Sequence, residues 1–125
     1  MKAQNYRDLV AWQVAMDFVE EVYQATRTFP KEEMYGLTGQ VRRSSVSVPS
    51  NIAEGQGRHR DPEFIHRLSI AHGSLCEAET QIIIGARLEY LDRAVCDHLL
   101  KQAGEVGRLT RGLWNSLENR SKGQR

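Results

Sequence analysis

Cysteine, proline and long apolar runs are all scarce in this chain of 125 residues, and each scarcity excludes a class of protein. The two cysteines, Cys76 and Cys96, lie 20 positions apart, which supplies neither a disulfide framework nor paired metal ligands. No apolar run approaches the roughly 20 residues of a membrane-spanning helix, and the first residues lack the apolar segment of a secretion signal. We therefore expect a soluble, single-domain protein of the cytoplasm that makes no contact with a membrane.

An excess of charge of one sign is also missing, because 17 lysines and arginines face 16 carboxylates and the formal net charge is +1. This balance argues against a basic nucleic-acid-binding tail and against an acidic disordered segment. The charge is nevertheless uneven: residues 36–70 carry five basic and three acidic side chains, and residues 106–125 carry five and one. Arginine, which is far commoner than lysine here, pairs with carboxylates and with phosphates, so both uses stay open.

Prolines occur only at positions 30, 49 and 62, and no stretch alternates between apolar and polar residues as a strand does. Apolar residues instead recur at spacings of three and four, which is typical of amphipathic helices. Pro30 ends the first helix, Asp61 and Pro62 start the third, and Asp92 caps the fourth. The sequence predicts one all-α domain, an up-down-up-down antiparallel four-helix bundle with helices at about 8–28, 34–54, 61–90 and 92–120.

The first predicted helix carries two neighbouring apolar arcs. The core seam is predicted at Leu9, Trp12, Met16, Val19, Tyr23 and Thr26. The second arc includes Val10, Val14 and Phe18 at successive i, i+4 positions. Because a monomeric bundle needs one apolar stripe per helix, we interpret Val10, Val14 and Phe18 as an interface with further copies of the chain. Single exposure of these three side chains is the alternative.

The middle of the second predicted helix is rich in serine and contains Pro49, which removes a backbone hydrogen bond and should kink the helix. Asn51, with Ser47, is expected to satisfy the backbone groups that Pro49 frees, Glu54 to pair with a nearby arginine, and Gly55 to end the helix. A role of Glu54 as a general base is the alternative. We favour the structural role, because one carboxylate without a second acid, a nucleophile or a metal is not a catalytic set.

The arginines of the chain have two kinds of expected partner, carboxylates and phosphates. Arg42 or Arg43 should lie near Glu77 or Glu79 of the third helix, and a buried pair of this kind would fix the register of the two helices. Arg58, His59, Arg60 and Arg67 form a basic cluster at the start of the third helix, and Arg108 and Arg111 begin a second one near the C-terminus. Both clusters are candidate phosphate-binding surfaces, with a solvated loop and a charged helix end as the alternative.

The sequence contains no motif typical of a catalytic, cofactor-binding or metal-binding site. We therefore expect no enzymatic activity, no cofactor and no metal. Phosphate-cradling glycine loops, nucleophile elbows and His-Glu-x-x-His motifs are all missing from the sequence. His72 and Cys76 share a helix face, and Cys96 and His98 follow, but their spacing is atypical of zinc sites and such cysteines are usually small core residues.

Several strings of the chain closely resemble one family. They are residues 8–15 (DLVAWQVA), 33–40 (EMYGLTGQ), 47–55 (SVPSNIAEG) and 70–75 (IAHGSL). The family is that of the four-helix-bundle proteins encoded in intervening sequences of bacterial 23S rRNA genes. It is similar in turn to the accessory variability protein of diversity-generating retroelements. The resemblance covers about residues 6–91, and the fourth helix matches by pattern alone.

The resemblance implies an up-down four-helix bundle that assembles into a ring-like homopentamer without enzymatic activity. It also implies interaction with nucleic acid, since the retroelement protein binds a reverse transcriptase and nucleic acid through a basic surface. A ring would repeat each weak basic cluster around its axis and so multiply its affinity for RNA or DNA. The alternative is a protein-binding adaptor whose ring recruits a partner enzyme without touching nucleic acid.

Overall fold

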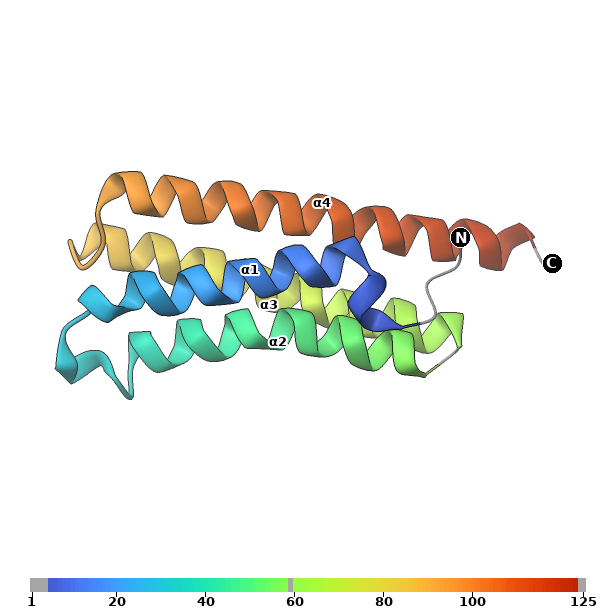
Figure 1. Ribbon diagram of the computed structural model, residues 1–125, viewed down its shortest axis with the longest axis horizontal. Coiled ribbons are helices and arrows are strands. Elements are labelled where there is room, and N and C mark those ends of the chain that lie inside the picture. The colour runs from blue at the N-terminus through green and yellow to red at the C-terminus, as the bar shows by residue number, and fades with distance from the viewer. Residues whose placement is uncertain (1–4, 59, 124–125) are drawn as a thin grey trace.

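The computed structural model describes residues 5–58 and 60–123, and within these ranges it contains four α-helices and no β-strand. The helices are α1 (Val10–Ala25), α2 (Leu37–Gly57), α3 (Asp61–Arg87) and α4 (Arg93–Gly123). They run antiparallel and side by side along one axis (Figure 1). Short 3-10 turns lie at Tyr6–Asp8, Thr26–Thr28 and Lys31–Glu33. The predicted all-α fold is confirmed, and each helix lies within a few residues of its predicted range.

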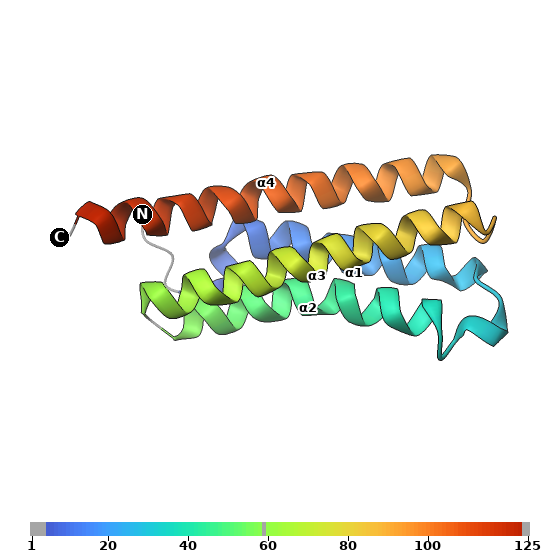
Figure 2. The same ribbon diagram turned by 180° about the vertical axis from the view of Figure 1, so that it is seen from behind.

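Each helix packs against two neighbours, in the order α1, α2, α3, α4 and back to α1, with α2 and α3 the closest pair. The view from behind shows α3 beside α2 near the connection between them and passing in front of α1 further along (Figure 2). Small side chains permit this approach, since Ser45 and Gly55 of α2 and Ser74 of α3 are buried. The interior is filled by aliphatic side chains of α2, α3 and α4, chiefly Val41, Val48, Ile52, Leu68, Leu75, Ile82, Leu99 and Val106.

The orientation of α1 about its own axis differs from the prediction. Ala11, Ala15, Phe18 and Val22 face the core. Phe18 is 0% exposed within the protomer, so its assignment to an interface between copies is wrong. Its ring fills the interior, and the two alanines on the same arc let α1 approach its neighbours closely.

The middle of the predicted seam of α1 is correspondingly turned outward, whereas its last residue, Thr26, is buried as predicted. Met16 is 37% exposed and Tyr23 is 40% exposed, while Trp12 and Val19 are half-buried. On the other flank, Val10 is 56% exposed and Val14 is half-buried against the core. The excess of apolar surface on this helix is therefore present, but its exposed part lies mainly on the arc that was predicted to be buried.

α2 continues without interruption through the buried Pro49, so the proline does not divide the helix. Side chains of the following residues bond to the backbone one turn earlier. Ser50 Oγ donates to the carbonyl of Val46 at 2.8 Å, and Asn51 Nδ2 donates to that of Ser47 at 2.8 Å. Pro49 frees the carbonyl of Ser45, whereas Asn51 bonds to the carbonyl and the hydroxyl of Ser47, so its predicted role in satisfying the groups that Pro49 frees stays a prediction.

The turn between α3 and α4 is closed by the two backbone hydrogen bonds of a Schellman motif. Tyr90 N donates to Gly85 O and Glu89 N donates to Ala86 O, at 2.9 and 3.0 Å. Glu89 has φ 64° in a position where glycine is usual. The Tyr90 hydroxyl also donates to Glu33 Oε2 at 3.0 Å, which ties this turn to the segment before α2. None of the helices in the described ranges has both the length and the apolar character needed to cross a bilayer.

Candidate nucleic-acid interface

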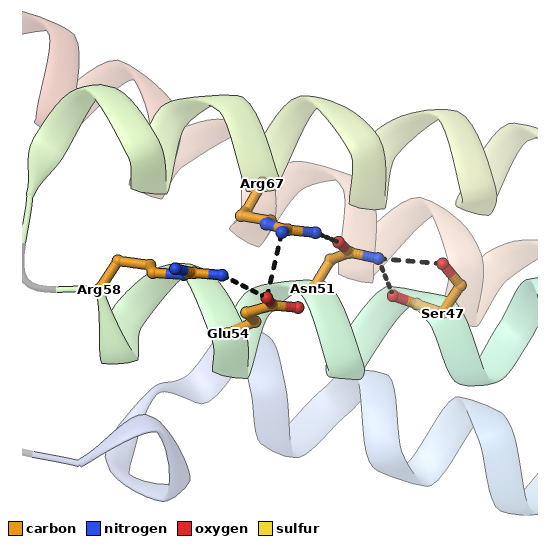
Figure 3. A network of polar contacts seen from close by, with 5 residues as sticks. All are labelled: Ser47, Asn51, Glu54, Arg58 and Arg67. Carbon is orange, nitrogen blue, oxygen red and sulfur yellow. Dashed lines mark hydrogen bonds and ion pairs between the residues drawn. The ribbon is translucent and has the colours of Figure 1, made fainter.

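A chain of polar contacts joins α2 to α3 at the motif that the sequence singled out (Figure 3). Glu54 Oε1 accepts from Arg58 Nη2 at 2.8 Å and lies 3.0 Å from Arg67 Nη2 of α3. Arg67 Nη1 donates to Asn51 Oδ1 at 3.3 Å, and Asn51 Nδ2 donates to Ser47 Oγ at 3.0 Å. The predicted pairing of Glu54 with a nearby arginine is confirmed, with two guanidinium groups in place of one.

The two arginines fix the charge of Glu54. The hydrogen bond from Arg58 and the positive charge of Arg67 lower the pKa of the Glu54 carboxyl. The same contact raises the pKa of Arg58. A carboxylate that is held ionised by two cations is a poor general base near neutral pH, because its proton affinity is reduced. The geometry fits a cross-link between α2 and α3.

Gly55 lies where α2 and α3 come closest. A Cβ atom at this position would sit 2.7 Å from Phe64 Cδ1 and 2.9 Å from Arg67 Cβ. The position therefore requires glycine for packing, beyond the helix-ending role that the sequence suggested. α2 in fact continues two residues further, to Gly57.

The first predicted basic cluster is largely neutralised by carboxylates. Arg58 and Arg67 share Glu54, and Arg60 lies 3.9 Å from Glu63. His59 lies outside the described residues. These arginines are placed together as predicted, but their charges are engaged within the protomer.

The second predicted cluster, on α4, is different. Arg108 and Arg111 are exposed, and neither takes part in an ion pair among the described residues. With Lys101 and Lys122 they follow one solvent-facing line of α4. We call this set the α4 stripe: Lys101, Arg108, Arg111, Asn115, Asn119 and Lys122, all exposed. The exposed Glu105 lies on the same helix face between Lys101 and Arg108. Arg120, which points to a neighbouring face, is instead bound to Asp61 of α3, and this contact raises the pKa of Arg120.

Charge is divided along the bundle. The first halves of α1 and α3 and the second halves of α2 and α4 meet at one end (Figures 1 and 2). This basic half (residues 5–17, 48–58, 60–74 and 108–122) carries eight basic and six acidic side chains, and the other half (18–47 and 75–107) carries seven and ten. The net charge of the whole chain thus conceals a basic half and an acidic half.

Other predicted constellations are not brought together. Arg42 Nε donates to Thr26 Oγ1 at 2.9 Å and its guanidinium lies over the Tyr23 ring, so Arg42 binds α1 and its predicted pairing with α3 is wrong. Arg43 forms no ion pair with Glu77 or Glu79 in the described part of the chain, and its guanidinium lies near Gly39. α1 occupies the side of α2 that Arg42 faces, which explains the difference.

The four residues considered for zinc do not come together in one cluster of the described chain. His98 Nε2 lies 2.7 Å from Glu21 Oε1, and Cys76 Sγ lies 3.7 Å from His72 Nε2. Cys96 is buried, and burial raises the pKa of its thiol. Beside the His98 pair lies a cavity of about 530 Å³ whose charged lining is acidic apart from that histidine, so it does not suit a phosphate.

One feature of the basic half was missed at the level of sequence. The Arg111 guanidinium lies 4.5 Å from the centre of the Trp114 ring, and Trp114 was not among the residues predicted for this surface. The signal was the i, i+3 spacing of the two residues, which places them on adjoining faces of a helix.

Comparisons with known proteins agree on the family and the fold. A family model described as 23S rRNA-intervening sequence protein matches residues 7–112. A crystal structure of a protein with unknown function from the S23 ribosomal protein family of Bacteroides thetaiotaomicron is similar, with a TM-score of 0.78. The two share 21% sequence identity over 85% of this chain and 96% of that one. No curated protein matches the chain.

Proposed function

Because this chain belongs to the 23S rRNA-intervening sequence protein family, we propose that it is a non-enzymatic, self-associating scaffold that binds RNA or DNA without sequence specificity. The α4 stripe is the observation that supports this proposal. Its four cations lie on one exposed helix face with no carboxylate of the described residues bound to them. Such cations are free to replace the counterions of a phosphate backbone.

The stripe has the dimensions of a backbone-tracking surface. Lys101 and Lys122 are 21 residues apart on a continuous helix, which at about 1.5 Å per residue places them some 30 Å apart. Base-specific readout is not part of the proposal, because phosphate contacts position a nucleic acid without reading its sequence.

Binding to a generic labelled RNA across a salt series tests the proposal. We expect affinity to fall as salt rises, and replacing both Arg108 and Arg111 by glutamine should reduce the slope of log K against log salt by roughly 1.4 to 1.8. The matched control replaces the exposed Arg87 and Arg93 of the acidic half by glutamine, which removes the same charge elsewhere. Undetectable binding of the unmodified protein at about 50 mM salt, or an equal loss in the control, would refute the proposal.

Self-association is the second component, and we assign it to the outward arc of α1. Trp12, Met16, Val19 and Tyr23 follow one line of the helix, and the 39% exposed Val46 lies on the adjoining α2. An apolar line of this length on a surface is typical of an interface. The family resemblance favours a ring of five copies, and a ring would repeat the α4 stripe around its axis.

Light scattering after size-exclusion chromatography tests this component. The proposal expects a mass near five times the 14.2 kDa of the protomer, and Met16→Glu should reduce it to the protomer mass. Val10→Glu, which changes the other flank of α1, is the control and should leave the mass unchanged. A protomer mass for the unmodified protein at micromolar concentration would contradict self-association.

The adaptor alternative has its own supporting observation at the opposite end of the bundle. Tyr35 is 96% exposed, and the exposed Met34 precedes it. At the same end, Ile84 and Leu88 of α3 are 41% and 50% exposed. Co-purification of one protein from the native cell with the unmodified chain, and its loss with Tyr35→Ser, would favour this function over nucleic-acid binding.

A further inference from the structure

Arg111 and Trp114 form a fixed stack on α4. The Arg111 guanidinium lies over the indole, with 4.5 Å between Cζ and the ring centre. The indole is half-buried against the core, and its Nε1 donates to Glu118 Oε1 at 2.7 Å. The stack is thus anchored from below by packing and from the side by a hydrogen bond, while Arg111 itself is exposed.

The surface beside this stack is open. A Cβ atom at Gly112 would meet no atom within 4 Å, so nothing in the protomer covers that position. Arg108 lies one turn before Arg111 and Asn115 one turn after it, and both are exposed. A flat group that settles on the Arg111 guanidinium would therefore have a cation on one side and an amide on the other.

A nucleobase fits this arrangement. Bases stack on arginine planes and on aromatic rings, and this contact is tolerant of sequence because every base has a π face. In a duplex these faces are covered by neighbouring base pairs, whereas in a single strand they are accessible. Phosphate contacts alone, in contrast, are available in both forms.

We propose that the Arg111–Trp114 stack is a base-stacking platform, and that the α4 stripe consequently binds single-stranded nucleic acid in preference to duplex. This inference rests on the nucleic-acid binding proposed above and adds the form of nucleic acid that is bound. Arg111 is the residue that touches the base, and Trp114 is a positioning residue that holds the guanidinium in place.

The test compares the affinities for a labelled single-stranded RNA and for the duplex of the same sequence. Loss of one stacked base costs about 5-fold or more in affinity. Trp114→Leu should therefore weaken single-strand binding by that factor and leave duplex binding unchanged, while Trp114→Phe should keep most of the preference. Equal affinity of the unmodified protein for both forms, or an equal loss for both forms in Trp114→Leu, would overturn the inference.

Arg111→Lys keeps the positive charge and removes the planar group, and it changes an exposed side chain that the fold does not need. It should lower single-strand affinity without altering the salt slope, which depends on the number of phosphates neutralised. An unaltered preference in Arg111→Lys would refute the stacking role even if Trp114→Leu failed to fold. If the unmodified protein binds neither form at about 50 mM salt, nucleic-acid binding itself fails. If it binds both forms equally with a normal salt slope, only the stacking inference fails.

Discussion

Gly55→Ala should destabilise the protein although alanine is the better helix former. The added Cβ would lie 2.7 Å from the Phe64 ring and 2.9 Å from Arg67 Cβ, both on α3. Arg67 Cβ is attached directly to the backbone, so α3 as a whole must shift, and overpacking of this kind costs about 2–3 kcal/mol. The higher helix propensity of alanine offsets about 1 kcal/mol. The net loss is therefore about 1–2 kcal/mol, or about 4–8 °C in Tm for a chain of this length.

Thermal unfolding followed by circular dichroism measures this shift, and Gly73→Ala is the matched control. Gly73 lies in the middle of α3 with no atom within 4 Å of a Cβ, so alanine there gains helix propensity without a clash. We expect that variant to be more stable by about 0.5–1 kcal/mol, or about 2–4 °C. A Gly55→Ala variant that melts at or above the temperature of the unmodified protein would show that α2 and α3 are not as close as the structure places them.

Three further predictions concern single side chains. Glu89→Gly should raise Tm, because relieving a positive φ stabilises by about 1 kcal/mol, and an unchanged or lower melting temperature would contradict the Schellman turn. Glu54→Gln should reduce the loss of stability that acid causes. The hydrogen bond from Arg58 lowers the pKa of Glu54 in the folded protein, so the ionised carboxylate stabilises the fold above the unfolded pKa of 4.5. This stabilisation is lost as the pH falls through the lower pKa of the folded state. Urea midpoints at a series of pH values measure this, and parallel curves for the two proteins would refute it. Phe18→Ala should cost about 3–5 kcal/mol because the ring is fully buried, whereas Val10→Ala should stay within about 0.5 kcal/mol, and urea unfolding that reverses this order would refute the orientation of α1.

The predicted helices could be placed from the sequence because their signals are local. Pro62 lies in the first turn of α3 as predicted, and Asp92 directly precedes α4. Asp61, in contrast, is the first residue of α3, and its carboxylate binds Arg120 in place of capping the helix. A proline or a cap residue acts on the backbone of its immediate neighbours, so its effect needs no knowledge of the rest of the fold. The end of α3 was placed three residues too far, because Glu89 adopts a left-handed conformation that its residue type does not signal.

The rotation of α1 could not be predicted, and the reason lies in its composition. Both arcs are apolar, so the period of 3.6 residues leaves the core direction undetermined over a wide sector. The choice depends on which arc packs better against the other helices. Ala11 and Ala15 allow close approach beside Phe18, whereas the arc of Trp12, Met16 and Tyr23 would place bulky groups at every turn.

The pairing of the arginines also depended on the packed structure, and it changes how the net charge bears on function. The carboxylates nearest the α2–α3 connection are each bound to an arginine: Glu54 to Arg58 and Arg67, and Asp61 to Arg120. These pairs cancel charge locally and at short range. The cations of the α4 stripe have no such partner in the described part of the chain, so their field reaches solvent. At moderate salt, a phosphate backbone interacts with charges within about 10 Å of it. It therefore responds to the local excess of positive charge on α4. A formal charge of +1 for the whole chain is therefore compatible with a surface that attracts polyanions.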